Sequence, residues 1–105
     1  MKAGWSFVVT VNRPDGVYLI GAMHHHWCGS GLHGACAGPS SLVMEKAAIL
    51  WALRWLALRR FPGSVVFRVD NLEAAKTTEG VIDAACPLDF ELQALWASRS
   101  HLLQS

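Results

Sequence analysis

Two strand-like apolar runs stand near the N-terminus, and a short polar segment separates them. The pattern predicts strands over Trp5–Asn12 and Val17–Trp27, joined by a turn at Arg13–Gly16. The Pro-Asp-Gly sequence within this segment is typical of turns, so Asp15 is interpreted as a turn residue. A glycine-rich loop, Cys28–Pro39, is expected after the second strand.

A long run of helix-forming residues follows this loop and predicts a helix over Ser41–Arg60. Serines precede the run and arginines end it, as expected for the two ends of a helix. Lys46 and Arg54 mark the more polar side. Helical spacing places Glu45 on the core-facing stripe with Ala48, Ile49, Ala52 and Leu56.

Beyond the Phe-Pro-Gly break that ends this helix, three further elements are predicted. They are a strand at Ser64–Asp70, a short helix at Leu72–Glu79 and a helix at Leu88–Leu103. Asn71 can cap the short helix and Gly80 can end it, while Pro87 is tolerated at the start of the last helix.

Glu45 and Asp70 are lone acids in otherwise hydrophobic elements, where a carboxylate is costly unless it is paired or bound to a cation. A helix followed by a strand through a short turn packs antiparallel to it. The sequence therefore predicts that the two carboxylates lie within reach of one divalent cation. The alternative is a helix-capping carboxylate and a strand-end acid bonded to a lysine or arginine.

Three motifs resemble the type 1 ribonuclease H domain, especially the forms carried by retrotransposon polyproteins. Glu45–Leu53 is similar to the family's central helix, Val65–Asn71 to its acid-terminated strand, and Gly4–Val9 to its second strand. Ser40 and Ser41 stand where the family has a Thr-Asn or Ser-Ser pair before the helix.

The resemblance implies hydrolysis of the RNA strand of RNA–DNA hybrids by a two-metal mechanism, with Mg²⁺ or Mn²⁺ as the cofactor. It makes Glu45 and Asp70 the catalytic metal ligands and places Ser40, Ser41 and Asn71 near the substrate. The implied partners are a hybrid or other nucleic acid and the rest of a reverse-transcriptase polyprotein. An intracellular location, in cytoplasm or nucleus, and no membrane span are expected.

The chain also departs from the family pattern. The family's first Asp, on strand one, has no counterpart, nor do its last Asp and its loop His; His101 matches no family histidine. We therefore expect residues 1–105 to form one incomplete α/β domain. Its predicted fold is an antiparallel hairpin plus helix–strand–helix–helix, without the first and last strands of the family sheet, and its activity alone is expected to be impaired.

Composition modifies this picture in two ways. The chain is 52% hydrophobic and 16% charged, with a mean hydropathy of +0.28, which indicates exposed surfaces meant for missing elements. Its net charge of +1 gives no electrostatic argument for nucleic acid. A non-catalytic ribonuclease H-like module that binds nucleic acid or protein therefore stays open as an alternative.

A cluster of six potential zinc ligands favours a third hypothesis, a small zinc-binding interaction domain. Its members are His24, His25, His26, Cys28, His33 and Cys36. The spacing differs from the usual finger pattern and the glycines make the loop flexible, so zinc is not expected. Cys86 stands apart, which indicates free thiols. The five tryptophans, including Trp51 and Trp55 on one helix face, are interpreted as core.

Overall fold

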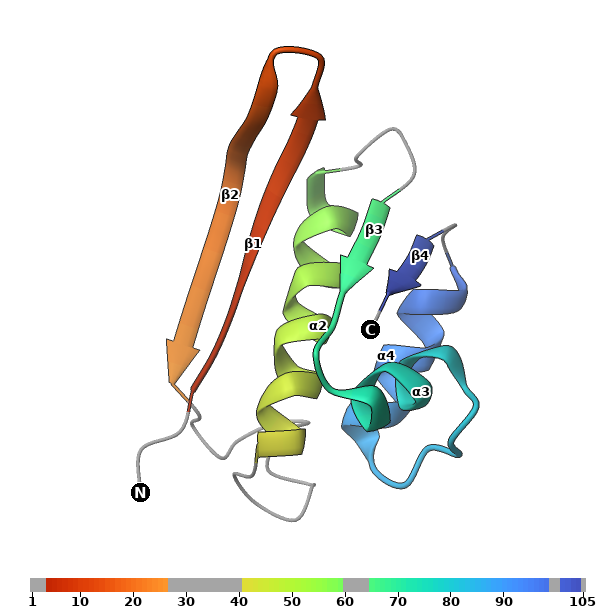
Figure 1. The fold of residues 1–105 in the computed structure, drawn as a ribbon. Coiled ribbons are helices and arrows are strands. Elements are labelled where there is room, and N and C mark those ends of the chain that lie inside the picture. The colour runs from red at the N-terminus through yellow and green to blue at the C-terminus, as the bar shows by residue number, and fades with distance from the viewer. Residues whose placement is uncertain (1–3, 27–40, 60–64, 99–100, 105) are drawn as a thin grey trace.

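The computed structural model describes residues 4–26, 41–59, 65–98 and 101–104, which form a mixed α/β arrangement of strands and three helices. Its elements are β1 (Gly4–Arg13), β2 (Gly16–His26), α2 (Ser41–Arg59), β3 (Val65–Arg68), α3 (Leu72–Glu79), α4 (Pro87–Ala97) and β4 (His101–Gln104). The antiparallel hairpin of β1 and β2 lies on one side of α2, and α3 and α4 lie on the other (Figure 1).

Helix α2 is the centre of this arrangement because its apolar residues surround the helix axis. The buried ones are Val43, Met44, Ala47, Ile49, Leu50, Ala52, Leu53, Trp55 and Leu56. A helix that is hydrophobic all round has to be covered on more than one side. It is covered by β1 on one side and by α3 and α4 on another.

Aromatic rings join the hairpin to α2. Trp5 of β1 stacks on Trp51 with ring centroids 5.7 Å apart, and Phe7 meets Trp55 edge-on at 6.4 Å. Trp5 and Trp55 are both buried, as the core interpretation of the tryptophans predicts. Gly21 of β2 lies directly against the Trp55 ring, since a Cβ atom on Gly21 would be 2.5 Å from Cζ2 of that ring.

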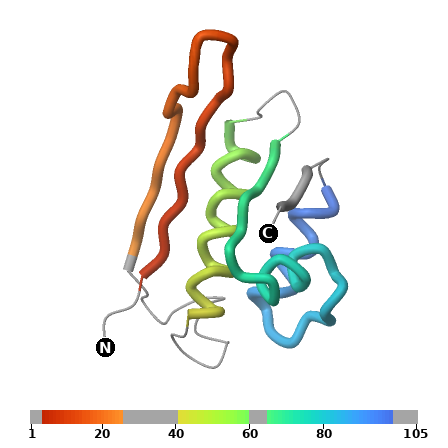
Figure 2. Tube along the Cα trace, viewed as in Figure 1, coloured from red at the N-terminus to blue at the C-terminus, as the bar shows by residue number. Residues whose placement is uncertain are grey.

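The hairpin register contains one irregularity, between Val9 and Thr10 of β1, whose partners are Gly21 and Leu19. Ile20 is therefore the extra residue of a β-bulge, and the trace of β2 is bent near the hairpin turn (Figure 2). The bulge keeps Gly21 on the face that Trp55 covers.

The side of α2 that faces α4 carries two ion pairs. Lys46 Nζ lies 3.0 Å from Asp89 Oδ1, and the two side chains are only 12% and 3% exposed. Oδ1 of Asp89 faces the Lys46 ammonium, while Oδ2 accepts a hydrogen bond from the Ala85 N–H. Arg54 pairs with Glu91 in a more open setting, 33% and 26% exposed. The side of α2 that Lys46 and Arg54 were expected to mark as more polar faces α4, which covers Lys46 and leaves Arg54 partly exposed.

Most predicted elements are confirmed to within a few residues, including the hairpin, α2 and β3. For α3 the predicted ends are also confirmed: Asn71 Oδ1 accepts from the Ala74 N–H, and Gly80 ends the helix with φ of 85°. That left-handed conformation favours glycine. The predicted loop at Cys28–Pro39 lies outside the described residues.

The last predicted helix, Leu88–Leu103, is partly wrong. Helix α4 ends at Ala97, and β4 pairs in parallel with β3, Val66 opposite Leu102 and Phe67 opposite Leu103. Because β3 provides a partner strand, tertiary pairing overrides the helical pattern of these leucines. The expected absence of any strand after the last helix was therefore wrong as well.

The strands form two separate two-stranded sheets. Among the described residues, β1 pairs only with β2 and β3 pairs only with β4, so each has one unpaired edge. Large apolar side chains are also exposed on the hairpin, where Val8, Val17 and Leu19 are 69%, 67% and 66% exposed. This exposure agrees with the apolar composition of the chain.

Replacing Gly21 with alanine is expected to destabilise the fold by about 1–3 kcal/mol, because the new methyl group collides with the Trp55 ring. Elsewhere in a strand the same change is neutral or favourable, since alanine restricts the unfolded chain. Denaturant unfolding measures the effect, with the exposed neighbour Ala22→Ser as control. Trp55→Phe should recover part of the loss, and an unchanged Gly21→Ala midpoint would contradict the packing.

The two ion pairs should contribute differently to the free energy of unfolding. Asp89→Ala leaves Lys46 buried without its carboxylate and is expected to cost about 3 kcal/mol or more. Glu91→Ala, on the same helix, should cost less than about 1 kcal/mol because its pair is partly solvated. Combining Lys46→Met with Asp89→Leu should restore stability in chemical unfolding. Equal losses for the two alanine variants would refute the assignment.

Candidate functional site

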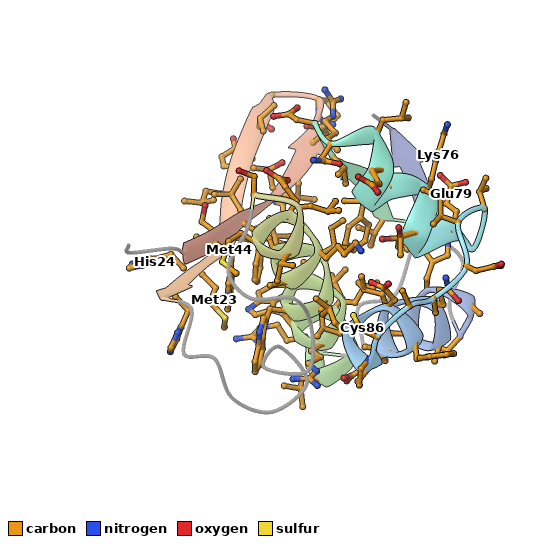
Figure 3. All side chains as sticks on the ribbon, turned by 90° about the horizontal axis from the view of Figure 1, so that it is seen from below. Met23, His24, Met44, Lys76, Glu79 and Cys86 are labelled. Atoms are coloured by element: carbon orange, nitrogen blue, oxygen red, sulfur yellow. The ribbon has the colours of Figure 1, made fainter. Side chains whose placement is uncertain are left out.

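Glu45 lies in the first turns of α2 and is half-buried. It borders a pocket of about 370 Å³ between the open end of the hairpin and the start of α2. The pocket is lined by Gly4, Trp5, Ser6, His24, His25, Met44, Glu45 and Ala48. In Figure 3, Met23 and His24 of β2 lie on the same side of the molecule as Met44 of α2.

The pocket beside Glu45 is therefore bordered by three elements, the two strands of the hairpin and α2. Strand β1 supplies Ser6, β2 supplies His24, and α2 supplies the carboxylate. Ser6 and His24 are opposite each other in the hairpin register. The sequence prediction did not include the histidines at this pocket, although the antiparallel pairing of the two predicted strands brings the histidine run back to the start of β1.

Asp70 lies on the bend that follows β3 and is exposed. Strand β3 runs antiparallel to α2, so its carboxyl end is directed toward the half of α2 that contains Glu45 (Figure 1). Asp70 is not among the residues that line the Glu45 pocket. The bridging of both carboxylates by one cation stays a prediction.

The three predicted substrate-binding residues have different surroundings. Ser41 is the exposed first residue of α2, and Ser40 lies outside the described residues. Asn71 is engaged locally, because its side-chain oxygen, 3.0 Å from the Ala74 nitrogen, caps α3. This bond uses one of the two lone pairs of that oxygen.

The histidine and cysteine cluster is only partly described. His24 borders the pocket, and His25 stacks on Trp5 with ring centroids 6.0 Å apart. Cys28, His33 and Cys36 lie outside the described residues. Within the described ranges, no three His, Cys, Asp or Glu side chains gather where they could hold a metal ion. Cys86 is disulfide-bonded, so its expected free thiol was wrong.

The tryptophans of α2 pack against other side chains of the protein and do not form a surface on which bases could stack. The guanidinium carbon of Arg54 lies 4.6 Å from the centroid of the Trp51 ring, and that of Arg59 lies 4.1 Å from the Trp55 ring. These contacts are additional to those that the two tryptophans make with β1. Trp96 packs edge-on against Phe67 at 5.4 Å. These contacts confirm the core interpretation for the described tryptophans and provide no base-stacking surface.

Comparison with known proteins gives no family assignment: no family model matches the chain, and neither the curated proteins nor the solved structures include a similar one. Across the described ranges, no helix combines the length and apolar character needed to cross a bilayer.

The clearest electrostatic perturbation is at the hairpin turn. The Tyr18 hydroxyl donates a hydrogen bond of 2.7 Å to Asp15 Oδ2. This bond, and to a smaller extent desolvation, raises the pKa of Tyr18 above its usual value because the acceptor is an anion. Asp15 thus acts in the turn, at the opposite end of the hairpin from the pocket, as its interpretation as a turn residue predicts.

Tyr18 is the chain's only tyrosine, so its titration can be followed by tyrosinate absorbance. We expect a pKa above the usual value of about 10, falling toward that value in Asp15→Asn. Because the folded-state pKa is raised, the stabilisation is present below the unfolded pKa and is lost as pH rises through the folded pKa. Identical titrations for the chain and Asp15→Asn would show that the bond is absent in solution.

Proposed function

We propose that this chain is the greater part of a ribonuclease H-type nuclease domain that acts on RNA–DNA hybrids and is impaired alone. The observation that supports this proposal best is the arrangement of the helices and strands. A hairpin packs on one side of α2, Glu45 stands in the first turns of that helix, and Asp70 follows a strand antiparallel to it (Figure 1). This arrangement supports the proposal, because the motifs that carry the resemblance lie on β1, on α2 and on β3 with the residues that follow it.

The unpaired strand edges support the same proposal. The arrows of β1 and β3 point in opposite directions in Figure 1, and neither strand pairs with the other. One strand between them would be antiparallel to β1 and parallel to β3, completing a mixed sheet with β2 and β4 at its ends. This is the position that the resemblance assigns to the family's first strand, which carries the first Asp.

Glu45 and Asp70 would be the residues that hold divalent cations. Carboxylate oxygens suit Mg²⁺, which keeps several waters and is bound through one or two carboxylates plus substrate phosphates. The half-buried setting of Glu45 leaves room for such waters. When bound, two such ions supply an activated water and stabilise the leaving oxygen. Two carboxylates alone hold this ion weakly, which is the reason for the expected impairment.

A non-catalytic hybrid-binding module is the second candidate. It is favoured by the absence, in the described ranges, of a third acidic or histidine side chain grouped with Glu45 and another ligand. The two candidates differ in one respect only, the supply of a further carboxylate from a strand between β1 and β3.

The test compares the 105-residue chain with a version that carries an N-terminal extension containing a strand with a central Asp. On a labelled RNA–DNA hybrid, we expect no cleavage above background from the chain alone. Mg²⁺-dependent cleavage should appear with the extension, because the added carboxylate allows the ions to be held as a pair. Glu45→Gln and Asp70→Asn should each abolish it, and the exposed Glu73→Gln should not.

Strong Mg²⁺-dependent cleavage by the unextended chain, lost in Glu45→Gln, would show that the missing strand is not needed. Tight hybrid binding without cleavage by the extended protein would favour the non-catalytic module. If the extended protein neither binds nor cleaves the hybrid, the proposed function is wrong.

A further inference from the structure

The disulfide of Cys86 is a covalent contact that the proposed function does not use. Cys86 is one of three cysteines in the chain, and the other two, Cys28 and Cys36, stand between β2 and α2 in the sequence. The described residues contain only the Cys86 half of the bond, so the second sulfur belongs to Cys28 or Cys36. Either pairing closes a covalent loop of the chain that contains α2, β3 and α3.

Cys86 lies at a point where the chain is already held to the start of α2. It is the N-cap residue of α4 and packs against the hydrophobic core (Figure 3). Three residues later, the buried Asp89 pairs with Lys46 in the first turns of α2 and accepts a hydrogen bond from the Ala85 N–H. The ion pair thus joins the start of α4 to α2, and the disulfide joins it to the segment that precedes α2 in the sequence.

We propose that this disulfide is a redox-sensitive switch of folding stability, closed in an oxidising compartment and opened by thiols of the glutathione class. A cross-link stabilises a fold mainly by restricting the unfolded chain, and more so when it closes a longer loop. Here the loop has about 50 to 60 residues and contains both Glu45 and Asp70. The inference concerns stability, so it does not rest on the proposed nuclease function.

Opening the bond is a two-electron exchange that two external thiols supply. The first external thiolate attacks one sulfur, forms a mixed disulfide and releases one cysteine as its thiolate. The second attacks the mixed disulfide, releases the other cysteine and leaves as the external disulfide. The two protons that the external thiols lose pass to the two cysteines.

The position of Cys86 favours this exchange. The N-terminus of α4 stabilises a thiolate on its N-cap residue, and the charge of Asp89 in the same turn is balanced by Lys46. Thiol pools of the cytosol keep most disulfides reduced, whereas oxidising compartments preserve them. The same chain is therefore expected to fold more stably in an oxidising compartment than in a reducing one.

The first test counts thiols in the 105-residue chain after refolding in an oxidising glutathione buffer. Alkylation of the denatured, unreduced chain should modify one cysteine, and alkylation after reduction should modify three. Mass spectrometry of unreduced peptides should find the Cys86 peptide joined to one that contains Cys28 or Cys36. Alkylation of Cys86 without reduction, or a disulfide between two chains on a non-reducing gel, would overturn the proposal.

The second test measures denaturant unfolding of the oxidised chain with and without a phosphine reductant. We expect the reductant to lower the folding equilibrium constant by about 30- to 1000-fold. Cys86→Ser should be about as unstable as the reduced chain and should no longer respond to the reductant. The matched control replaces with serine whichever of Cys28 and Cys36 the peptide mapping leaves unpaired, and it should keep the response. Equal midpoints with and without reductant would show that the disulfide does not control stability.

A switch must also close again, which a purely structural cross-link need not do. The native chain, equilibrated at graded ratios of glutathione thiol to glutathione disulfide, should pass between the one-thiol and three-thiol forms. The same curve should be obtained from the oxidised and from the reduced side. This measurement needs no variant, so a loss of packing in Cys86→Ser does not affect it. Failure of the bond to form again from the reduced chain would refute the switch.

Discussion

The burial of α2 on two sides is the constraint on which the other features of this structure depend. Its apolar residues surround the axis, so neither the hairpin nor the α3–α4 pair alone could keep them from water. The hairpin and the α3–α4 pair contact α2 through different kinds of interaction. Aromatic stacking joins α2 to β1, whereas ion pairs and aliphatic packing join it to α4. Because both coverings are fixed to one helix, Glu45 at its start is held beside the hairpin.

The same arrangement leaves strand edges without hydrogen-bonded partners in the described ranges. Two strand pairs flank α2 without a shared hydrogen-bonded neighbour in the described ranges, and each inner strand keeps an unpaired edge. Unpaired edges next to exposed apolar side chains promote association with other chains. The exposed valines and leucine of the hairpin add to this liability. A strand supplied between β1 and β3 would satisfy both edges at once, and under the proposed function the same strand would supply the further carboxylate.

Local chemistry made some elements predictable and others not. The ends of α3 follow from Asn71 and Gly80, whose side-chain and backbone preferences act within a few residues. The strand at Leu102 and Leu103 was missed because its stability comes from β3, more than thirty positions away in the chain. The burial of Lys46 was missed for a similar reason: the acid that neutralises it belongs to α4. The position of Glu45 on the helix was predictable, but finding the histidines that border its pocket required the hairpin register.

The carboxylate of Glu45 can be understood from what surrounds it. A side chain in this position gains from the helix dipole but loses hydration in a half-enclosed pocket, and the described lysines and arginines do not compensate it. A mobile cation with its own waters restores both solvation and charge balance without requiring further packing. A charged residue fixed in the pocket would instead neutralise the site permanently. Under the proposed nuclease function, leaving the carboxylate without such a partner costs stability in the free chain and keeps the carboxylate available to a metal ion.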